Sequence, residues 1–302
     1  MDEIHQFVVD HPSGRLKIEV LDRKEHAGKS SSLNFALKYA TGEVVIVSDS
    51  DCFWPSDILA RALPYLSDPN VGAVAGREVL LNSQLSWVTK SEVLYNSFVQ
   101  TIRHGESKAY STIFFQGGFA AYKKDLLCEF DRETDDSGTA LNIVQKNART
   151  LIIPEVTFYT VFPTKWKNKV ITKMRRANQL QRIWIRCFGM LIRRKLILPK
   201  SIAVPEIYLH IFGPLVFAAL IATTTLLVLG NPLLLPALLL ILLPLLSIQK
   251  SRIYLVEGIQ NNLILLVSMA TMISSRNFNV WKTVDESRSL LSEKTLREKC
   301  LI

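Results

Sequence analysis

Two aspartates separated by a single residue, Asp49 and Asp51, come directly after the apolar run VVIV and one serine. Carboxylate oxygens suit Mg²⁺ or Mn²⁺, and one or two carboxylates beside substrate phosphates form a common metal site. The plainer interpretation is a polar turn after a buried strand, because one such spacing arises easily by chance in a chain of 302 residues. The surroundings of the pair must decide between the two interpretations.

A second acidic pair, Asp135 and Asp136, lies in the stretch TDDSGTALNIV at residues 134–144. Transfer of a group to a hydroxyl requires a base that takes the hydroxyl proton, and a carboxylate can supply it. Helix capping is the alternative, with Thr134 or Asp135 at the N-terminus of the helix that follows. The two roles are compatible, since a helix N-terminus beside a site holds a carboxylate in a defined place.

Basic side chains that could hold phosphates occur in two places. Arg175 and Arg176 lie in KMRRANQLQRIW (173–184), and Lys29 lies in HAGKSSSLN (26–34). Each arginine taken alone has a plainer interpretation as a charge at a membrane surface. A P-loop is excluded at Lys29, because no glycine stands five residues before it.

The elements that must position these residues follow an alternating pattern over the first 160 residues. Strands are predicted over 17–24, 43–49 and 71–80, and helices over 28–42 and 55–68. This alternation predicts an α/β domain with a parallel-rich sheet and helices on both faces. Ligands of such sheets bind at the carboxyl ends of the strands, which is where the first acidic pair stands.

A long apolar stretch follows this domain. Residues 207–249 contain no Asp, Glu, Lys or Arg, and one helical span needs only about 20 apolar residues. Spans are predicted over 207–230 and 233–248. The segment 253–273, interrupted by Glu257 and other polar residues, is either a third span or a helix in the membrane interface. A buried helical hairpin of a soluble protein is the alternative.

The segment between the domain and the spans is strongly basic. Residues 165–200 contain no acid and carry more positive charge than the whole net charge of +9. Apolar residues recur at helical spacing from Leu180 to Ile192, which predicts an amphipathic helix at the membrane surface, with packing on a soluble core as the alternative. Positive charge next to spans predicts that residues 1–200 are cytoplasmic. This position beside the membrane explains the basic charge without a nucleic-acid partner.

The predicted organisation therefore has four parts: a catalytic domain over 1–164, a basic interface segment over 165–200, a multi-pass region of the cell membrane over 201–275, and a polar cytoplasmic tail over 276–302. The cysteines lie far apart, without a CxxC pair or a histidine at ligand spacing. This pattern excludes a disulfide framework and a zinc site.

The order of these motifs resembles the membrane-integrated family-2 glycosyltransferases, the family of cellulose synthase and hyaluronan synthase. The resemblance covers about residues 2–290 and depends on GKSSSLNFAL, VSDSD, FFQGGFAAYKKDLL, TDD, an Arg-rich segment and apolar helices, in that order. It implies a GT-A type fold, a nucleotide-sugar donor such as a UDP-sugar, and Mg²⁺ or Mn²⁺. The acceptor would be a growing polysaccharide, a lipid-linked sugar or a polyprenyl phosphate, and membrane lipids would be further partners.

The resemblance assigns the chemistry to the four aspartates. Asp49 and Asp51 match the DxD motif, with Asp51 as the more direct metal ligand. Asp136 matches the general base at the end of the T-E-D motif, with Asp135 in the preceding acidic position. The implied mechanism is inverting: Asp136 deprotonates an acceptor hydroxyl, which attacks the anomeric carbon from the face opposite the leaving diphosphate.

The resemblance also implies a set of substrate-binding residues, which comprises Lys29, Asn34, Gln116, Gly117, Gly118, Arg175 and Arg176. The FQGG segment resembles the acceptor-site segment of the family. Relatives carry Q-x-x-R-W after the base. Here KMRRA (173–177) has the spacing but different residues, whereas QLQRIW (179–184) has the residues but is one residue too long; the first is favoured.

The chain departs from the family at its start. Residues 1–12 resemble the helix that follows the first strand–helix–strand unit, so the sheet is expected to lack its first strands. A truncated enzyme is one interpretation of this pattern, and a catalytically inactive membrane scaffold or fragment is the alternative. A channel or transporter is disfavoured, because it would need paired polar residues within the spans, where His210 is the only histidine, acid, lysine or arginine.

Overall fold

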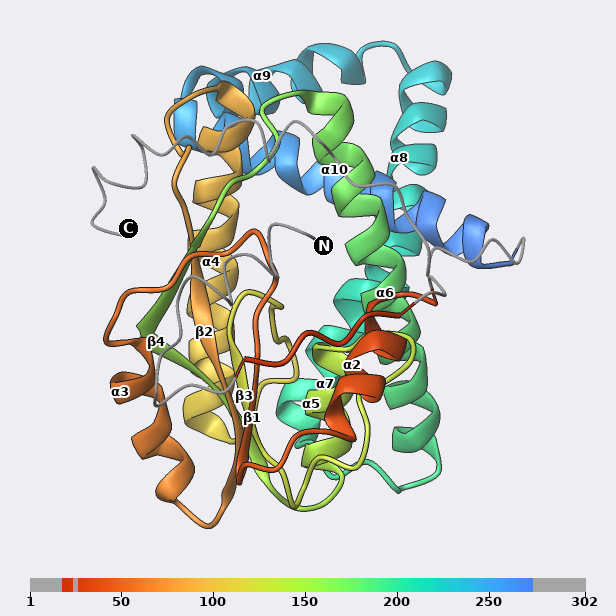
Figure 1. Cartoon of the computed structure of the whole chain (residues 1–302). Helices are drawn as coiled ribbons and strands as arrows, with labels where there is room; N and C mark the ends of the chain where they lie inside the picture. The colour runs from red at the N-terminus through yellow and green to blue at the C-terminus, as the bar shows by residue number, and fades with distance from the viewer. Residues whose placement is uncertain (1–17, 24–26, 274–302) are drawn as a thin grey trace.

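The computed structural model describes residues 18–23 and 27–273 (Figure 1). The predicted tail over 276–302 lies outside these residues, as do the two ends of the strand predicted over 17–24. Residues 18–23 are irregular, so the structure shows no strand in the described part of that segment.

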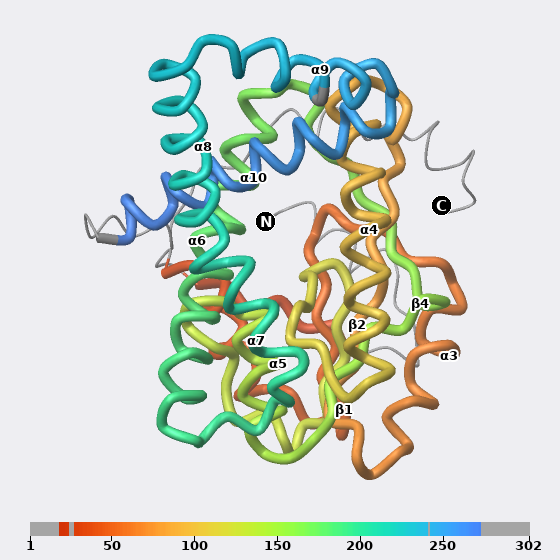
Figure 2. Tube along the Cα trace, turned by 180° about the vertical axis from the view of Figure 1, so that it is seen from behind, coloured from red at the N-terminus to blue at the C-terminus, as the bar shows by residue number. Residues whose placement is uncertain are grey.

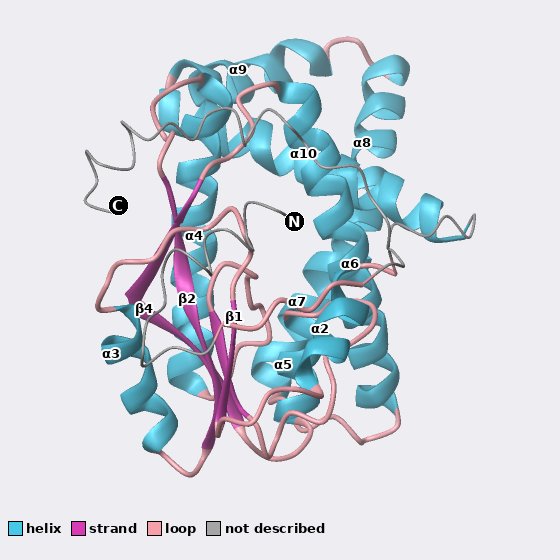
Figure 3. Ribbon diagram, in the orientation of Figure 1, coloured by secondary structure: helices cyan, strands magenta, loops and turns pink. Residues whose placement is uncertain are grey.

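The described residues form one four-stranded sheet in the order β1-β3-β2-β4 (Figure 3). Its strands are β1 (Val44–Val47), β2 (Val71–Leu80), β3 (Ala120–Lys123) and β4 (Arg149–Thr160). Strands β2 and β4 are parallel, whereas β3 runs antiparallel to both β1 and β2. The sheet is therefore mixed: β1, β2 and β4 run in one direction, in keeping with the predicted parallel-rich sheet, and β3, which was not among the predicted strands, runs against them between β1 and β2.

Alternate residues of the central strands pack on opposite faces of the sheet. On one face, Ala120 and Tyr122 of β3 join a core with α5 (Ser137–Val144), α6 (Trp166–Ile192) and α7 (Lys200–Ile207). On the other face, Phe119 and Ala121 pack with α3 (Ile58–Ala62) and the 3-10 turn Leu63–Ser67. This alternation is the two-residue period of a buried strand. Helices cover both faces, as predicted.

The long helix α4 (Trp87–Ala109) lies along β4 and β2 (Figure 2). Its N-terminus is a capping box, in which the Ser86 hydroxyl accepts a hydrogen bond from the Thr89 N–H at 3.1 Å and the Thr89 hydroxyl accepts one from the Ser86 N–H. At its C-terminus, Arg149 donates a hydrogen bond to the carbonyl of Tyr110 at 2.7 Å. These contacts fix α4 against the sheet.

Helix α6 shows where the basic, amphipathic segment packs. Ile183, Trp184 and Cys187 of the predicted apolar face are buried in the same core as the sheet. Five of its basic residues pair with acids elsewhere: Lys169, Lys173, Arg176, Arg182 and Arg186. Part of the positive charge is thus compensated inside the protein. The position of this segment at a membrane surface remains a prediction.

The apolar region forms α8 (Gly213–Gly230), α9 (Leu234–Ser247) and α10 (Gln249–Ile273). Helix α8 continues α7 through a π-helical segment, Tyr208–Phe212. Within the described residues, two helical stretches, Lys200–Gly230 and Gln249–Met272, are long and apolar enough to cross a membrane. Helix α9 has 14 residues, or about 21 Å, which is shorter than a hydrocarbon core of about 30 Å. The second stretch with the length of a span is therefore α10, and the span over 233–248 stays a prediction.

Candidate active site

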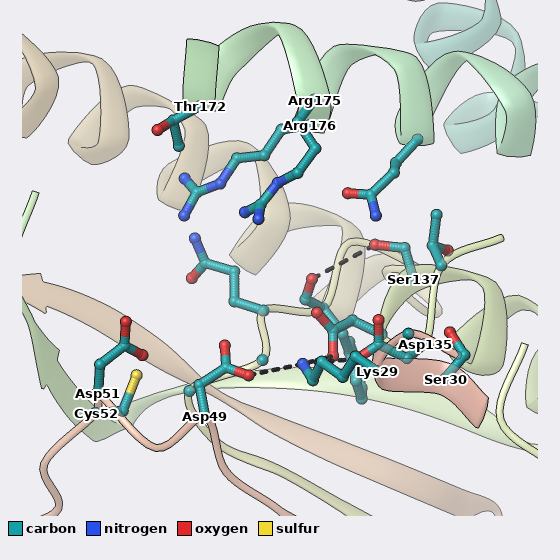
Figure 4. Close-up of a pocket in the computed structure, with 18 of the residues that line it drawn as sticks. Lys29, Ser30, Asp49, Asp51, Cys52, Asp135, Ser137, Thr172, Arg175 and Arg176 are labelled. Atoms are coloured by element: carbon teal, nitrogen blue, oxygen red, sulfur yellow. Dashed lines mark hydrogen bonds and ion pairs between the residues drawn. The ribbon is translucent and has the colours of Figure 1, made fainter. Parts of the chain in front are cut away.

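A cavity of about 1100 Å³ opens at the edge of the sheet where β1, β2 and β4 end. Its floor contains Asp49 and Asp51 after β1, and Asp135 and Asp136 before α5. Helix α2 (Lys29–Leu37) contributes its first residues, and α6 lies above the floor (Figure 4). The two acidic pairs predicted from the sequence thus share one cavity, although about 85 residues separate them along the chain.

The ammonium group of Lys29 connects the two acidic pairs. Its Nζ atom lies 2.7 Å from Asp49 Oδ1, 2.6 Å from Asp135 Oδ2 and 3.8 Å from Asp136 Oδ1 (Figure 4). Burial lowers the pKa of Lys29, but the carboxylates of Asp136, Asp135 and Asp49 outweigh it and raise that pKa above its ordinary value. Lys29 is therefore a permanent cation among the acidic groups.

Asp49 and Asp51 have the chemistry of a site for a divalent cation. One ligand atom from each of Asp49, Asp51 and Cys52 lies within 4.8 Å of the others. Burial, followed by the charges of the two aspartates, raises the pKa of the Cys52 thiol to about 12. A neutral thiol is a poor ligand for a hard cation, so the two carboxylates would hold Mg²⁺ or Mn²⁺, and the donor set fits either.

The glycines of FQGG allow the backbone to pass between the acidic groups and the sheet. A Cβ atom at Gly117 would lie 2.5 Å from Asp49 Oδ2 and 2.7 Å from Lys29 Nζ, and one at Gly118 would overlap the ring of Phe158. The Gly117 carbonyl accepts a hydrogen bond from the Asp49 N–H at 2.8 Å. Gly117 thus positions Asp49, and Gly118 makes room for packing.

In the turn before α5, one residue caps the helix and another is the candidate base. The Thr134 hydroxyl accepts a hydrogen bond from the Gly138 N–H at 2.6 Å, so Thr134 caps the helix. Asp136 occupies the N-cap position without a side-chain capping bond. Burial, and next the neighbouring Asp135, raise the pKa of Asp136 well above its usual range. The Asp136 carboxyl group therefore keeps its proton to a higher pH than an exposed aspartate does.

Asn34 lines the cavity and also makes structural hydrogen bonds. Its Nδ2 donates to the Phe130 carbonyl at 2.8 Å, and its Oδ1 accepts from the Phe130 N–H at 2.7 Å. Both ends of the amide are thus bound to backbone, which ties α2 to the segment that leads to Asp135 and Asp136. Asn34 is therefore a structural link in the wall of the cavity, and its part in substrate binding stays a prediction.

Two guanidinium groups face the acidic floor from α6. Arg175 and Arg176 line the cavity on the side opposite Asp49 and Asp51 (Figure 4). Burial, followed by repulsion from Arg176, lowers the pKa of Arg175 to about 10. Burial also lowers the pKa of Arg176, but Glu78 and other acids reverse this and raise it. An anion between the arginines and the floor would relieve the repulsion between them.

The structure also locates the two competing versions of the Q-x-x-R-W motif. In KMRRA, Lys173 is buried in an ion-pair cluster with Glu92 and Glu257, while the two arginines after it reach the cavity. In QLQRIW, Arg182 pairs with Glu133 and Trp184 is buried in the core. Only the first version brings its arginines to the cavity.

Glu78, at the end of β2, was missed by the sequence analysis. Its side chain is 5% exposed, and its Oε2 accepts hydrogen bonds from Asn96 at 3.2 Å and from Gln116 at 3.3 Å. Its Oε1 lies 3.7 Å from Arg176 Nη2. Burial raises the pKa of Glu78. The available signal was an acid near the carboxyl end of the predicted strand VGAVAGREVL, at the edge of the sheet where Asp49 follows β1.

Comparisons with known proteins identify sequences and a solved structure that are similar to this chain. Residues 1–131 match the model of Glycosyl transferase family 2. A 65-residue stretch is 35% identical to beta-monoglucosyldiacylglycerol synthase of Synechocystis sp., covering 22% of this chain and 14% of that protein. The N-acetylglucosaminyltransferase of Rhizobium meliloti is 24% identical over 168 residues, 51% of this chain and 39% of the relative. The matches thus span less than half of either relative.

The similarity of structure extends further along the chain. A mannosyltransferase from Pyrobaculum calidifontis, solved in complex with GDP-Man and Mn²⁺, superimposes with a TM-score of 0.74 and is 27% identical. The match covers 91% of this chain and 74% of that one. This chain therefore has the GT-A fold, and its residues 1–131 are similar to glycosyltransferase family 2.

Proposed function

We propose that this chain is an inverting, membrane-bound glycosyltransferase that moves a sugar from a nucleotide-sugar to an acceptor hydroxyl. The observation that carries the proposal is the position of Lys29, which contacts Asp49 of the metal-binding pair and Asp135 beside the base in one cavity. The carboxylates that would serve departure of the diphosphate therefore lie close to those that would serve deprotonation of the acceptor.

The residues divide the chemistry as follows. Asp49 and Asp51 would hold a divalent cation, which neutralises charge on the leaving diphosphate. Arg175 and Arg176 bind the phosphates from above, and Asp136 takes the proton of the acceptor hydroxyl. The hydroxyl oxygen then attacks the anomeric carbon from the side opposite the diphosphate. Lys29 keeps Asp49 and Asp135 close together throughout.

The donor is a nucleotide-sugar, and binding measurements will identify its nucleobase and its sugar. The family resemblance implies UDP-sugars, whereas the mannosyltransferase with the similar structure was solved with GDP-Man. The acceptor is a glycan or a lipid-linked sugar; one relative is named as the synthase of a glycolipid, beta-monoglucosyldiacylglycerol.

The membrane assignment is supported by the surface of α8. The helical stretch Lys200–Gly230 has 31 residues, and only 6% of its most apolar window is buried inside the protein. Monomeric soluble proteins rarely expose an apolar surface of this size, and lipid would cover it. The basic residues before it favour a cytoplasmic catalytic domain.

Donor binding tests the proposal. The full chain in detergent should bind one member of a panel of UDP- and GDP-sugars in the presence of Mn²⁺, measured by calorimetry. Asp51→Ala should abolish the metal-dependent binding, and EDTA should reproduce that loss in the wild-type protein. A folded sample that binds no member of the panel would favour the alternative, an inactive membrane scaffold.

A further inference from the structure

Four buried charges join three helices that are distant in the sequence. Glu92 of α4 lies 3.3 Å from Lys169 and 3.0 Å from Lys173, both of α6. Glu257 of α10 lies 2.8 Å from Lys173 and also pairs with Lys169. None of the four side chains is more than 9% exposed. The two carboxylates and two ammonium groups balance to zero charge, so the cluster is stable only when all four are present.

The polar residues of α10 contact α6 over a longer stretch. Asn261 accepts a hydrogen bond from Lys173 at 3.3 Å, and the Leu265 carbonyl accepts one from Gln181 Nε2 at 3.0 Å. Helices α10 and α6 cross where these contacts occur (Figures 1 and 2). The acid and amides that interrupt the apolar sequence of α10 thus include the groups that attach it to α6.

The attachment points of α10 flank the cavity-lining part of α6. Lys169 and Lys173 come before Arg175 and Arg176 in the helix, and Gln181 comes after them. Because a helix is stiff over such a length, a shift or rotation of α6 at these points moves both guanidinium groups. A displacement of about 1 Å at a positioning group can change a rate by about a hundredfold.

We propose that Glu257, together with Glu92, positions the guanidinium groups of Arg175 and Arg176. Helix α10 then contributes to donor binding although it does not line the cavity. The inference rests on the proposed function for its ligand, a nucleotide diphosphate group. Glu257 does not line the cavity, and its effect passes through Lys169 and Lys173 to α6.

The first test is the affinity of the full chain in detergent for the nucleoside diphosphate of the preferred donor, with Mn²⁺. Glu257→Gln should weaken binding about tenfold if the arginines shift by a fraction of an ångström. Glu206→Gln is the matched control. It also removes a buried carboxylate from an ion pair, with Arg103 at 2.6 Å, but Glu206 lies on α7, and its ion-pair partners among the described residues, Arg103 and His210, lie outside α6. The control should leave the affinity within twofold of wild type.

A double-mutant cycle separates positioning from a general loss of structure. In an Arg175→Ala/Arg176→Ala background, Glu257→Gln should have little further effect on diphosphate affinity, because the groups it positions are gone. Additive effects, or an equal loss in Glu206→Gln, would overturn the proposal. If Glu257→Gln does not fold, Asn261→Leu removes one hydrogen bond and keeps the ion pairs, and should show a smaller loss of the same kind.

Hydrogen exchange provides a readout that does not need a donor. Without ligand, residues 170–180 should exchange faster in Glu257→Gln than in wild type, and Glu206→Gln should leave that segment unchanged. Unchanged exchange in Glu257→Gln would contradict the positioning role. If residues 170–180 exchange faster in Glu257→Gln but the wild-type protein binds no nucleotide, the link between Glu257 and α6 stands. Only the proposed function is then rejected.

Discussion

Lys29 and Asp135 form an ion pair of 2.6 Å between the first turn of α2 and the turn that precedes α5. The same ammonium group contacts Asp49 at 2.7 Å, so one cation joins residues from three separate segments. Without it, the carboxylates of Asp49, Asp135 and Asp136 would repel one another in a partly buried cavity. The pair therefore holds together the metal-binding and proton-accepting halves of the site.

Replacing Lys29 should separate these halves. In Lys29→Met we expect the transfer rate to fall at least about a hundredfold, because the base and the donor lose their common positioning group. Steady-state kinetics with the preferred donor checks this. Lys38→Met, a lysine outside the cavity at the end of α2, is the control and should transfer at the wild-type rate.

Asp136→Asn should remove the base and keep the donor site. An amide cannot take the acceptor proton, so transfer should fall by about a hundred- to ten-thousandfold. Calorimetry should show donor affinity within a few-fold of wild type, since Asp49, Asp51 and the arginines remain. Loss of donor binding together with transfer would contradict the role of Asp136 as base.

The pH dependence of transfer follows from the same residue. Burial and Asp135 raise the pKa of Asp136, so this carboxyl group stays protonated to a higher pH than an exposed one. A base works only when deprotonated, and kcat/KM should therefore rise with pH through the raised pKa and reach a plateau above it. A rate that stays constant from acid to neutral pH would show that Asp136 does not accept the proton.

Gly117→Ala tests how closely the backbone approaches the metal-binding pair. The new Cβ atom would lie 2.5 Å from Asp49 Oδ2, so we expect weaker Mn²⁺-dependent donor binding. Gly105→Ala, inside α4 with no atom within 4 Å of the added carbon, is the matched control. It should keep full activity and stabilise the helix by up to about 1 kcal/mol. Equal donor affinity in both variants would show that Asp49 tolerates the displacement.

Glu78→Gln tests the carboxylate that lies beside Arg176. The amide can keep one hydrogen bond with Asn96 or Gln116, but it no longer balances the arginine charge 3.7 Å away. We expect kcat/KM to fall by about tenfold, since Arg176 and Gln116 lose a common partner. Glu43→Gln, on the chain just before β1 and outside the cavity, should behave as wild type.

Local patterns in the sequence were enough to locate much of the fold and the floor of the site. The run VVIV predicted β1 because a strand with both faces covered is apolar at every position, and the acidic pair after it therefore had to lie at a strand end. The glycine and serines at its start and Gly42 at its end likewise predicted α2, and helical periodicity predicted the C-terminal part of α6. These features depend on neighbours along the chain, which a sequence displays directly.

Other features required contacts between distant segments. The insertion of β3 between β1 and β2, the meeting of Glu78 with Arg176, and the pairing of Lys173 with Glu257 have no local signature, because each joins residues that are far apart in the sequence. A sequence pattern does not distinguish a lysine at a membrane surface from a lysine in a buried ion pair. Only the packing of α4, α6 and α10 decided which lysines are buried and which arginines reach the cavity.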